Sequence, residues 1–196
     1  MRDFFYFSRN ARTSGNFDDL MGAGRIDIAL HIIIMSFFVS NATRDNVKLH
    51  LFFYGQPDPP KHLELGPFKN EEDIQGISKK DLSGLLKRML YKYKKGIKNE
   101  AFKNCWIEKK DIFKELNELK KQNRKIYILD DKGEDIRKIQ IGENPIFVLG
   151  DQEGFNKKEM KELEQIGQKI SIGKITYFAS QTLAIIQNEL DRQKIE

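Results

Sequence analysis

The chain has few of the residues that form disulfide bonds or bind metal ions. Among its 196 residues it has one cysteine, Cys105, so an internal disulfide and a cysteine-ligated metal site are excluded. This composition fits a reducing compartment. The histidines at 31, 50 and 62 lack the spacing of a metal-binding motif. The sequence therefore predicts that no metal is bound.

Long hydrophobic runs are also missing. The longest candidate, residues 26–39, contains polar side chains and is shorter than the roughly 20 residues that a spanning helix needs. The apolar run near Met1 is too short for a signal peptide. We therefore expect a cytoplasmic protein without a membrane segment.

Neither sign of charge dominates the chain. Lysine and arginine number 34 against 29 aspartates and glutamates, and the net charge of +5 modestly favours an anionic partner. A hydrophobic fraction of 39% is ordinary for a globular protein. The length predicts a single domain over residues 1–196.

Two common nucleotide-binding signatures are absent. There is no G-x-x-x-x-G-K-[ST] motif, which excludes a P-loop, and no G-x-G-x-x-G follows the first predicted strand, which argues against a Rossmann site. The glycines that could shape a site lie in the C-terminal third. One predicted strand ends in Gly150-Asp-Gln-Glu-Gly154, and another leads into a loop at Gly173. In open α/β proteins, nucleotides bind at such strand ends.

Alternating strand and helix patterns predict an α/β fold, with a largely parallel sheet and helices on both faces. Strands are expected at 2–7, 47–54, 125–129, 145–150 and 169–172. Helices are expected from about residue 25 to 39 and at 81–95, 111–121, 156–166 and 177–193. Residues 130–134 are expected to form a turn, and residues 55–60 a stiff loop that three prolines exclude from a ladder.

Several motifs together resemble a known family over the full length of the chain. They are Gly24-Arg-Ile-Asp27, Tyr54-Gly-Gln-Pro-Asp-Pro-Pro60, Gly133-Glu-Asp135, Gly150-Asp-Gln-Glu-Gly154 and the segment 171–181. With them the chain resembles the SPOUT superfamily of knotted methyltransferases and, within it, the tRNA (pseudouridine-54) N1-methyltransferase family (TrmY-like). The resemblance implies a deep C-terminal trefoil knot, S-adenosylmethionine (SAM) as cofactor, tRNA as substrate and a homodimer.

The resemblance also implies a cofactor pocket formed by two strand ends, a loop and the last helix. Its residues would be Leu129, Gly150, Ile172, Gly173, Lys174, Ile175, Thr176, Tyr177 and Thr182. From the residue pattern alone, Leu129 is better explained as a core leucine and Gly150 as a turn glycine. The family commonly has cysteine at the position of Thr182. Since methyl transfer from a sulfonium needs no covalent enzyme intermediate, we interpret this position as packing against the cofactor.

Candidate catalytic residues lie in two of the motifs. Asp27 could accept the proton that leaves pseudouridine N1, with Arg25 on a phosphate. Alternatively, Asp27 interacts with the helix dipole and Arg25 is solvated or paired with it. Pro57 could frame the target base, or it could simply stiffen its loop.

A basic run is the candidate RNA contact. It contains Lys87, Arg88, Lys92, Lys94 and Lys95. Such a run is usually a solvated helix face, and the functional alternative is phosphate binding.

The sequence therefore predicts a SAM-dependent enzyme that methylates N1 of pseudouridine 54 in tRNA. One alternative is another SPOUT RNA methyltransferase, acting on N1 of an rRNA pseudouridine or on a ribose 2′-oxygen. The other is an RNA-binding homologue without catalytic activity.

Overall fold

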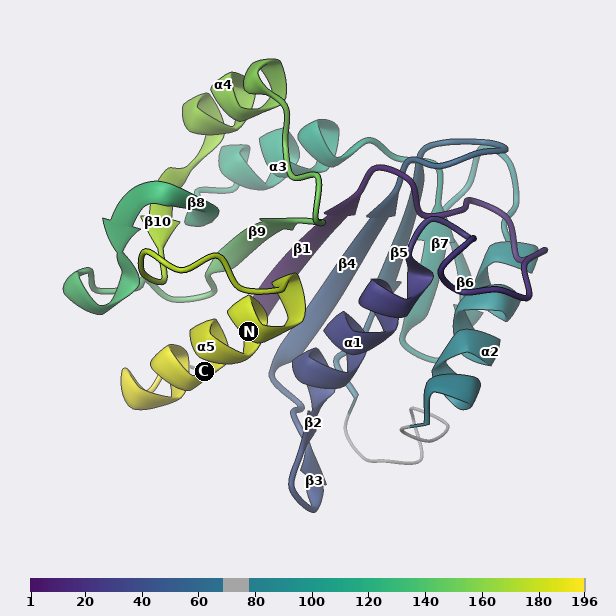
Figure 1. The fold of residues 1–196 in the computed structure, drawn as a ribbon, viewed down its shortest axis with the longest axis horizontal. Helices are drawn as coiled ribbons and strands as arrows, with labels where there is room; N and C mark the ends of the chain where they lie inside the picture. The colour runs from purple at the N-terminus through teal and green to yellow at the C-terminus, as the bar shows by residue number, and fades with distance from the viewer. Residues whose placement is uncertain (69–77, 196) are drawn as a thin grey trace.

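The computed structural model describes residues 1–68 and 78–195 (Figure 1). Its main sheet has eight strands in the order β10-β8-β9-β1-β4-β5-β7-β6. These strands are β1 (Arg2–Ser8), β4 (Val47–Phe53), β5 (Lys61–Leu65), β6 (Asn99–Phe102), β7 (Cys105–Glu108), β8 (Ile126–Asp135), β9 (Ile146–Gly150) and β10 (Gln168–Ser171). A separate ribbon pairs β2 (Phe38–Val39) with β3 (Ala42–Thr43).

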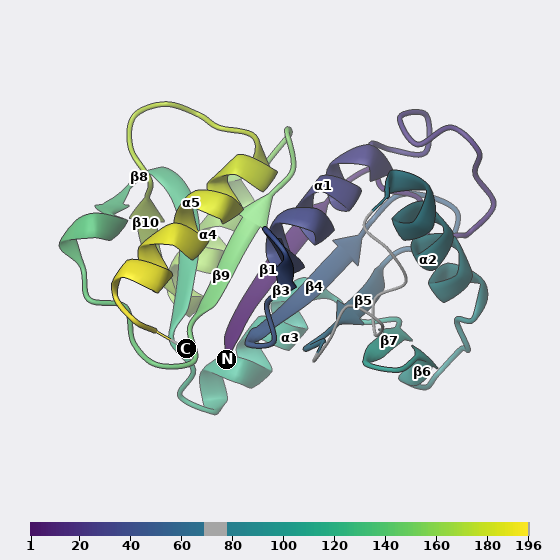
Figure 2. The ribbon, with the colours of Figure 1, turned by 90° about the horizontal axis from the view of Figure 1, so that it is seen from below.

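The helices cover both faces of the sheet, as Figures 1 and 2 show. They are α1 (Ile26–Phe37), α2 (Lys79–Tyr91), α3 (Ile112–Lys121), α4 (Lys157–Ile166) and α5 (Ala179–Arg192), with a short 3-10 helix η2 (Ile136–Lys138). Apolar side chains of α1, α2 and α5 belong to one buried cluster, and those of α3 and α4 belong to another. The prediction of a largely parallel α/β fold with helices on both faces is confirmed.

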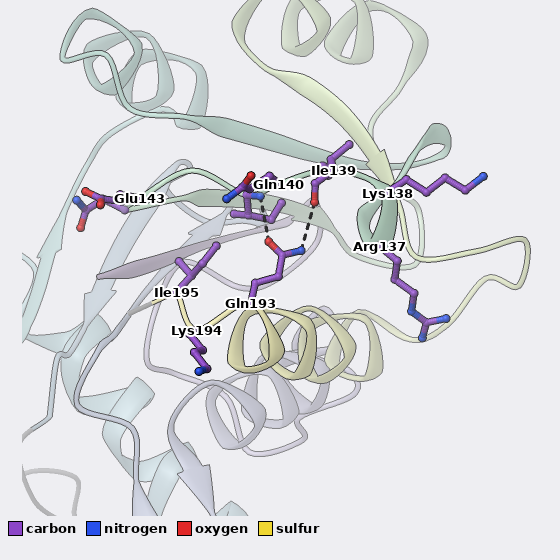
Figure 3. A pocket seen from close by; sticks show the side chains of 10 residues that line it. Arg137, Lys138, Ile139, Gln140, Glu143, Gln193, Lys194 and Ile195 are labelled. Carbon is purple, nitrogen blue, oxygen red and sulfur yellow. Dashed lines mark hydrogen bonds between the residues drawn. The ribbon is translucent and has the colours of Figure 1, made fainter.

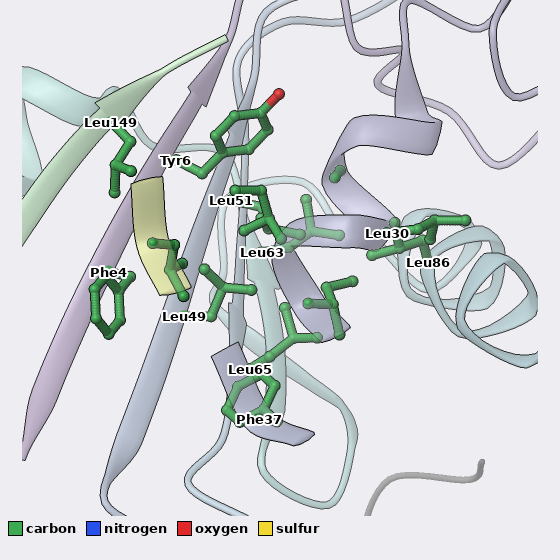
Figure 4. Packing of buried hydrophobic residues seen from close by; sticks show 14 of the residues in the cluster. Phe4, Tyr6, Leu30, Phe37, Leu49, Leu51, Leu63, Leu65, Leu86 and Leu149 are labelled. Carbon is green, nitrogen blue, oxygen red and sulfur yellow. The ribbon is translucent and has the colours of Figure 1, made fainter. Parts of the chain in front are cut away.

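Strand β1 lies in the middle of the parallel part, between β9 and β4. Because side chains alternate along a strand, Phe4 and Tyr6 enter the α1 side of the core (Figure 4), while Phe5 and Phe7 enter the α3 side. Every residue of β1 is buried. This burial on both faces explains the unbroken aromatic run from Phe4 to Phe7 in the strand.

The antiparallel part of the sheet was not predicted. β5 pairs antiparallel with β4 and with β7, and β6 closes this edge beside β7. β5 begins at Lys61, directly after the last proline of the loop. β6 and β7 have four residues each and mix polar with apolar types, so neither carries a clear strand pattern.

The turn predicted at residues 130–134 is wrong, because β8 continues to Asp135. β10 pairs with both ends of this long strand, and the register shifts between Lys169 and Ile170. Gly133 permits the pairing, since a β-carbon there would lie 2.4 Å from the carbonyl carbon of Ile170. The strand thus continues through a local turn signal, and β10 pairs with it on either side of residues 129–133.

Two helix boundaries also differ from the prediction, and both affect candidate residues. α2 ends at Tyr91, so the last lysines of the basic run follow the helix instead of lying on it. α5 begins at Ala179, so Tyr177 and Phe178 belong to the preceding loop. The helix predicted from residue 156 is α4, which a capping box between Asn156 and Glu159 opens.

We expect Gly24→Ala to destabilise the fold strongly. Gly24 has φ +76°, and a β-carbon there would lie 1.7 Å from the carbonyl oxygen of Asn10. Left-handed backbone and overpacking together cost roughly 3 kcal/mol. Gly96→Ala is the matched control, because Gly96 has φ +84° but a β-carbon added to it would have no other atom within 4 Å. Urea unfolding should show a clearly larger loss for Gly24→Ala, and equal losses would contradict this account.

Candidate functional site

A cavity of about 540 Å³ opens beside Leu129 of β8 and the carboxyl end of β9, against the start of α5. A smaller hollow of about 140 Å³ adjoins it and shares Leu129, Thr176, Tyr177 and Thr182 with it. Of the residues predicted to bind the cofactor, all except Lys174 line one of these two hollows. The structure thus brings together residues that are up to 53 positions apart in the sequence, from Leu129 to Thr182.

The motif Gly150-Asp-Gln-Glu-Gly154 forms a tight turn at one wall. Gly154 has φ +63° and donates its N–H to the carbonyl of Asp151 over 3.0 Å. A β-carbon on Gly150 would lie 2.9 Å from the α-carbon of Gly154, so the turn could not close as tightly around a larger residue. The turn leaves peptide groups at the cavity edge without a side chain in front of them.

The loop after β10 forms the opposite wall. Ser171 anchors its base, because its hydroxyl donates to the carbonyl of Gly173 over 3.1 Å and accepts from the Gly173 N–H over 3.0 Å. Residues 173–178 are exposed. Thr182 faces both hollows from the first turn of α5 and is half-buried.

The lining suits the cofactor that the resemblance implies. Leu129, Leu149, Phe155 and Met160 supply apolar wall, and the glycine turns supply peptide donors and acceptors. Sites for aromatic and thioether groups are typically built in this way. The pocket therefore fits an adenine-containing ligand.

Arg25 and Asp27 form a closed pair at the start of α1. The guanidinium donates from Nε to Oδ1 and from Nη2 to Oδ2 of Asp27, each over 3.0 Å. Hydrogen bonds and charge from Arg25 hold the pKa of Asp27 below its ordinary value. Neither side chain lines the two hollows, although the neighbouring Ile28 does. The paired alternative is the one the structure shows.

The proline loop is fastened to the rest of the fold around Asp58. The hydroxyl of Thr13 donates to the carbonyl of Gly55 over 2.8 Å and accepts from the N–H of Asp58 over 2.9 Å. Lys61 donates to the Asp58 carboxylate over 2.7 Å, and Lys109 binds its other oxygen. The two lysines lower the pKa of Asp58 to about 2. Pro57 is exposed on this loop and lies outside the lining of both hollows.

The predicted basic run does not form one continuous face. Lys87 pairs with Asp18 over 3.1 Å. Lys92 donates to the carbonyl of Ala101 over 2.6 Å and lies over the ring of Phe102, as does Arg88. Lys94 and Lys95 are exposed after the end of α2. They are therefore the members of the run most open to a polyanion.

Sequence reasoning missed a buried polar cluster across β4 and β5. His50 Nδ1 and His62 Nε2 lie 2.9 Å apart, and with Glu64 they place one ligand-type atom each within 4.8 Å. These atoms are already paired, since the histidines share a hydrogen bond and Glu64 binds Lys48 and Lys98. Burial holds the pKa of His50 well below its ordinary value. The pairing of β4 with β5 would have revealed the cluster, but β5 carried no recognised signal.

A larger hollow, about 690 Å³, lies at the other end of β9, near η2 and the end of α5 (Figure 3). Gln193 spans it by donating to the carbonyl of Ile139 over 3.2 Å and accepting from the N–H of Ile141 over 3.1 Å. Figure 3 shows Arg137 and Lys138 pointing in different directions. The hollow is therefore open but lacks convergent side chains.

Comparison with known proteins places the chain among RNA-modifying enzymes. A family model described as "Putative SAM-dependent RNA methyltransferase" matches residues 1–195. A Methanosarcina mazei protein named tRNA (pseudouridine(54)-N(1))-methyltransferase is 32% identical, over 100% of this chain and 93% of its own. A Thermococcus kodakarensis protein of the same name is 31% identical, over 97% and 99%.

A solved structure shares the fold. The crystal structure of Archaeoglobus fulgidus Nep1 bound to S-adenosylhomocysteine matches with a TM-score of 0.64 at 13% identity, over 98% of each chain. At this identity the likeness concerns the fold alone. Within the described residues, no helix is both long and apolar enough to cross a membrane.

We expect Asp58→Asn to weaken the proline loop in a pH-dependent way. The pKa of Asp58 is about 2 in the folded protein and roughly 4 when unfolded, so its contribution is present above about pH 4 and lost as pH falls towards 2. Because Asp58 is half exposed, the difference at neutral pH should be about 0.5–1 kcal/mol. Urea unfolding from pH 5 to pH 2 should show this difference shrinking. The exposed Asp45→Asn is the control, and the same pH dependence in both variants would contradict the assignment.

Proposed function

The chain belongs to the family of SAM-dependent RNA methyltransferases, and we propose on this premise that it methylates N1 of pseudouridine 54 in tRNA. Full-length similarity to relatives of that name supports the substrate. The cavity beside Leu129 of β8 and the end of β9 is the structural observation that carries the proposal, because it gathers the residues implied to hold the cofactor.

We propose that SAM binds in the two adjoining hollows. Leu129, Gly150 and Thr182 would form walls, and the loop 172–177 would supply peptide donors and acceptors. The cofactor supplies an electrophilic methyl group, so neither a thiolate at position 182 nor a metal ion is required. Threonine therefore serves here as packing. Holding the methyl group and the base in line would contribute much of the rate.

The residues that we propose to contact the target base and the RNA backbone lie outside the lining of the two hollows. Pro57, on the loop fastened through Asp58, would frame the base, and Arg25 would contact a phosphate. Asp27 is a weak candidate for proton acceptor, because Arg25 occupies both of its oxygens and lowers its pKa. Among the basic residues Lys87, Arg88, Lys92, Lys94 and Lys95, exposure favours the last two as phosphate contacts.

A homodimer would bury an exposed apolar surface beside the cavity. Ile175, Tyr177 and Phe178 are 67%, 40% and 75% exposed on the loop before α5. Clustered apolar side chains at a surface mark interaction sites. We propose that a second copy of the chain covers these side chains and completes each site. Light scattering measures the molecular mass in solution and so distinguishes a homodimer from a monomer.

Three further features follow from the family assignment. We propose that residues 1–196 act as one domain, that the C-terminal segment is threaded as a trefoil knot, and that the enzyme works in the cytoplasm on tRNA. A single sheet that includes β1 and β10 supports the first feature. An experimental density map traced from β8 to α5 would test the second.

The proposed activity predicts a defined product. Incubating the purified protein with SAM and a tRNA that carries pseudouridine 54 should yield 1-methylpseudouridine, detected by nucleoside mass spectrometry. The same tRNA with uridine 54 should stay unmodified. Thr182→Phe should place a ring in the region that the two hollows share and reduce S-adenosylhomocysteine affinity at least tenfold, whereas Thr182→Cys should preserve it. Methylation at a 2′-oxygen or in rRNA alone would contradict the assignment.

If Lys94 and Lys95 contact phosphates, replacing both with alanine should weaken tRNA binding. The slope of log affinity against log salt should fall by up to about 1.8, because each neutralised phosphate contributes roughly 0.9. The control is Lys114→Ala with Lys121→Ala, two exposed lysines on α3. Fluorescence anisotropy at several salt concentrations measures the slopes. An unchanged slope in the Lys94/Lys95 variant would remove these residues from the RNA surface.

A further inference from the structure

The cavity beside Leu129 of β8 and the end of β9 is lined by one charged side chain. Among the described residues that line it, Asp151 alone carries a charge, and the rest of the wall is apolar, hydroxyl, amide or glycine. Asp151 directly follows the end of β9 and is half-buried. In such a wall a carboxylate without a cation favours an N–H donor.

The carboxylate of Asp151 is held rigidly from one side. Its Oδ2 accepts from the N–H of Arg9 over 2.8 Å and from the hydroxyl of Ser8 over 3.2 Å. Its Oδ1 accepts from the N–H of Glu153 over 3.0 Å. A carboxylate can accept about four hydrogen bonds, so Oδ1 retains one acceptor position. Ser8 is 1% exposed, which anchors the group to the buried end of β1.

The neighbouring cation is engaged elsewhere. The guanidinium of Arg9 binds Glu159 at 2.6 Å and the carbonyl of Gly154 at 3.3 Å. Within the described part of the chain, no ion pair includes Asp151. Asp27 differs from Asp151 in two respects. Asp27 is paired with Arg25, and it lies outside the cavity lining.

We infer that Asp151 recognises the N1–H group of the target pseudouridine and accepts its proton. The inference rests on the proposed function and names a residue for its chemistry. As the N1–carbon bond forms and the carbon–sulfur bond breaks, the N1 proton moves to Oδ1 of Asp151, which becomes a neutral carboxylic acid and later returns the proton to water. Uridine has a C–H group at the corresponding ring position, which is a poor donor. Asp151 therefore also selects pseudouridine over uridine.

Binding tests the recognition step without any turnover. Two T-arm RNAs that differ only in pseudouridine or uridine at the target position are titrated with protein saturated with S-adenosylhomocysteine. The unaltered protein should prefer the pseudouridine RNA roughly tenfold, as expected for one hydrogen bond to a charged group. Asp151→Ala should abolish the preference. Glu162→Gln, a charge-removing change at an exposed position of α4 and outside the cavity lining, should retain it.

Single-turnover methylation tests the proton transfer. Asp151→Asn should slow the step by about 10²–10⁴-fold, the range for a positioned general base. This deficit should narrow as pH rises, because hydroxide then removes the N1 proton in place of the carboxylate. Ser8→Ala, which removes only one support of the carboxylate, should give a smaller loss.

The affinity for S-adenosylhomocysteine distinguishes a role of Asp151 in the reaction from a role in binding the cofactor. Affinity within about threefold of the unaltered protein in both Asp151 variants shows an intact pocket and supports the inference. Parallel loss of cofactor affinity would overturn it by assigning the carboxylate to the cofactor. Full pseudouridine preference in Asp151→Ala, or an unchanged methylation rate in Asp151→Asn, would also overturn it. If the unaltered protein methylates neither RNA, the proposed function itself fails, and this outcome is distinct from a failure of Asp151.

Discussion

The end of β1 is the constraint on which the rest of the site depends. The strand is buried on both faces and pairs in parallel with β9 and β4, so its carboxyl end has little freedom. Ser8 and Arg9 there bind the carboxylate of Asp151. Asn10 follows Arg9 in the chain, and its carbonyl group packs directly against Gly24 and Gly55. The glycine turn before α1, the proline loop and the cavity wall thus share one anchor.

The distribution of charge separates structural from functional groups. Most charged side chains near the site are already matched, as in the pairs Arg9–Glu159, Arg25–Asp27 and Lys61–Asp58. Such pairs fix loops, and each partner reduces the other's ability to act on a ligand. A carboxylate that is held by N–H and hydroxyl groups but not by a cation keeps its charge available. Asp151 is in this state, whereas Asp27 is paired with Arg25, so Asp151 is the better candidate to act on a ligand.

Most of the parallel half of the fold could be predicted because β1, β4, β9 and the start of β8 are rich in buried apolar residues and its helices are amphipathic. The antiparallel half could not, since β6 and β7 are short and mixed in polarity. Their strand character comes from neighbours in space: β7 pairs with β5, and β5 with β4. The same limitation explains the unrecognised contact of His50 with His62, which exists only because those two strands pair. At β8, the strand continues through a local turn pattern, and its partner β10 pairs on either side of that pattern.

Fold class, family and the identity of the residues implied to hold the cofactor follow from the amino-acid order alone, because motifs and hydrophobic periodicity are local properties that survive without coordinates. That order leaves open whether Leu129 is a core residue or a wall of a site. Tertiary contacts establish that Leu129 lines a cavity with Thr182, that Asp27 is neutralised by Arg25 and that Asp151 is not. These outcomes depend on which atoms lie within a few ångströms of each other. Hydrogen bonding and charge pairing act over that range, and strand order and register, not proximity in sequence, set those distances.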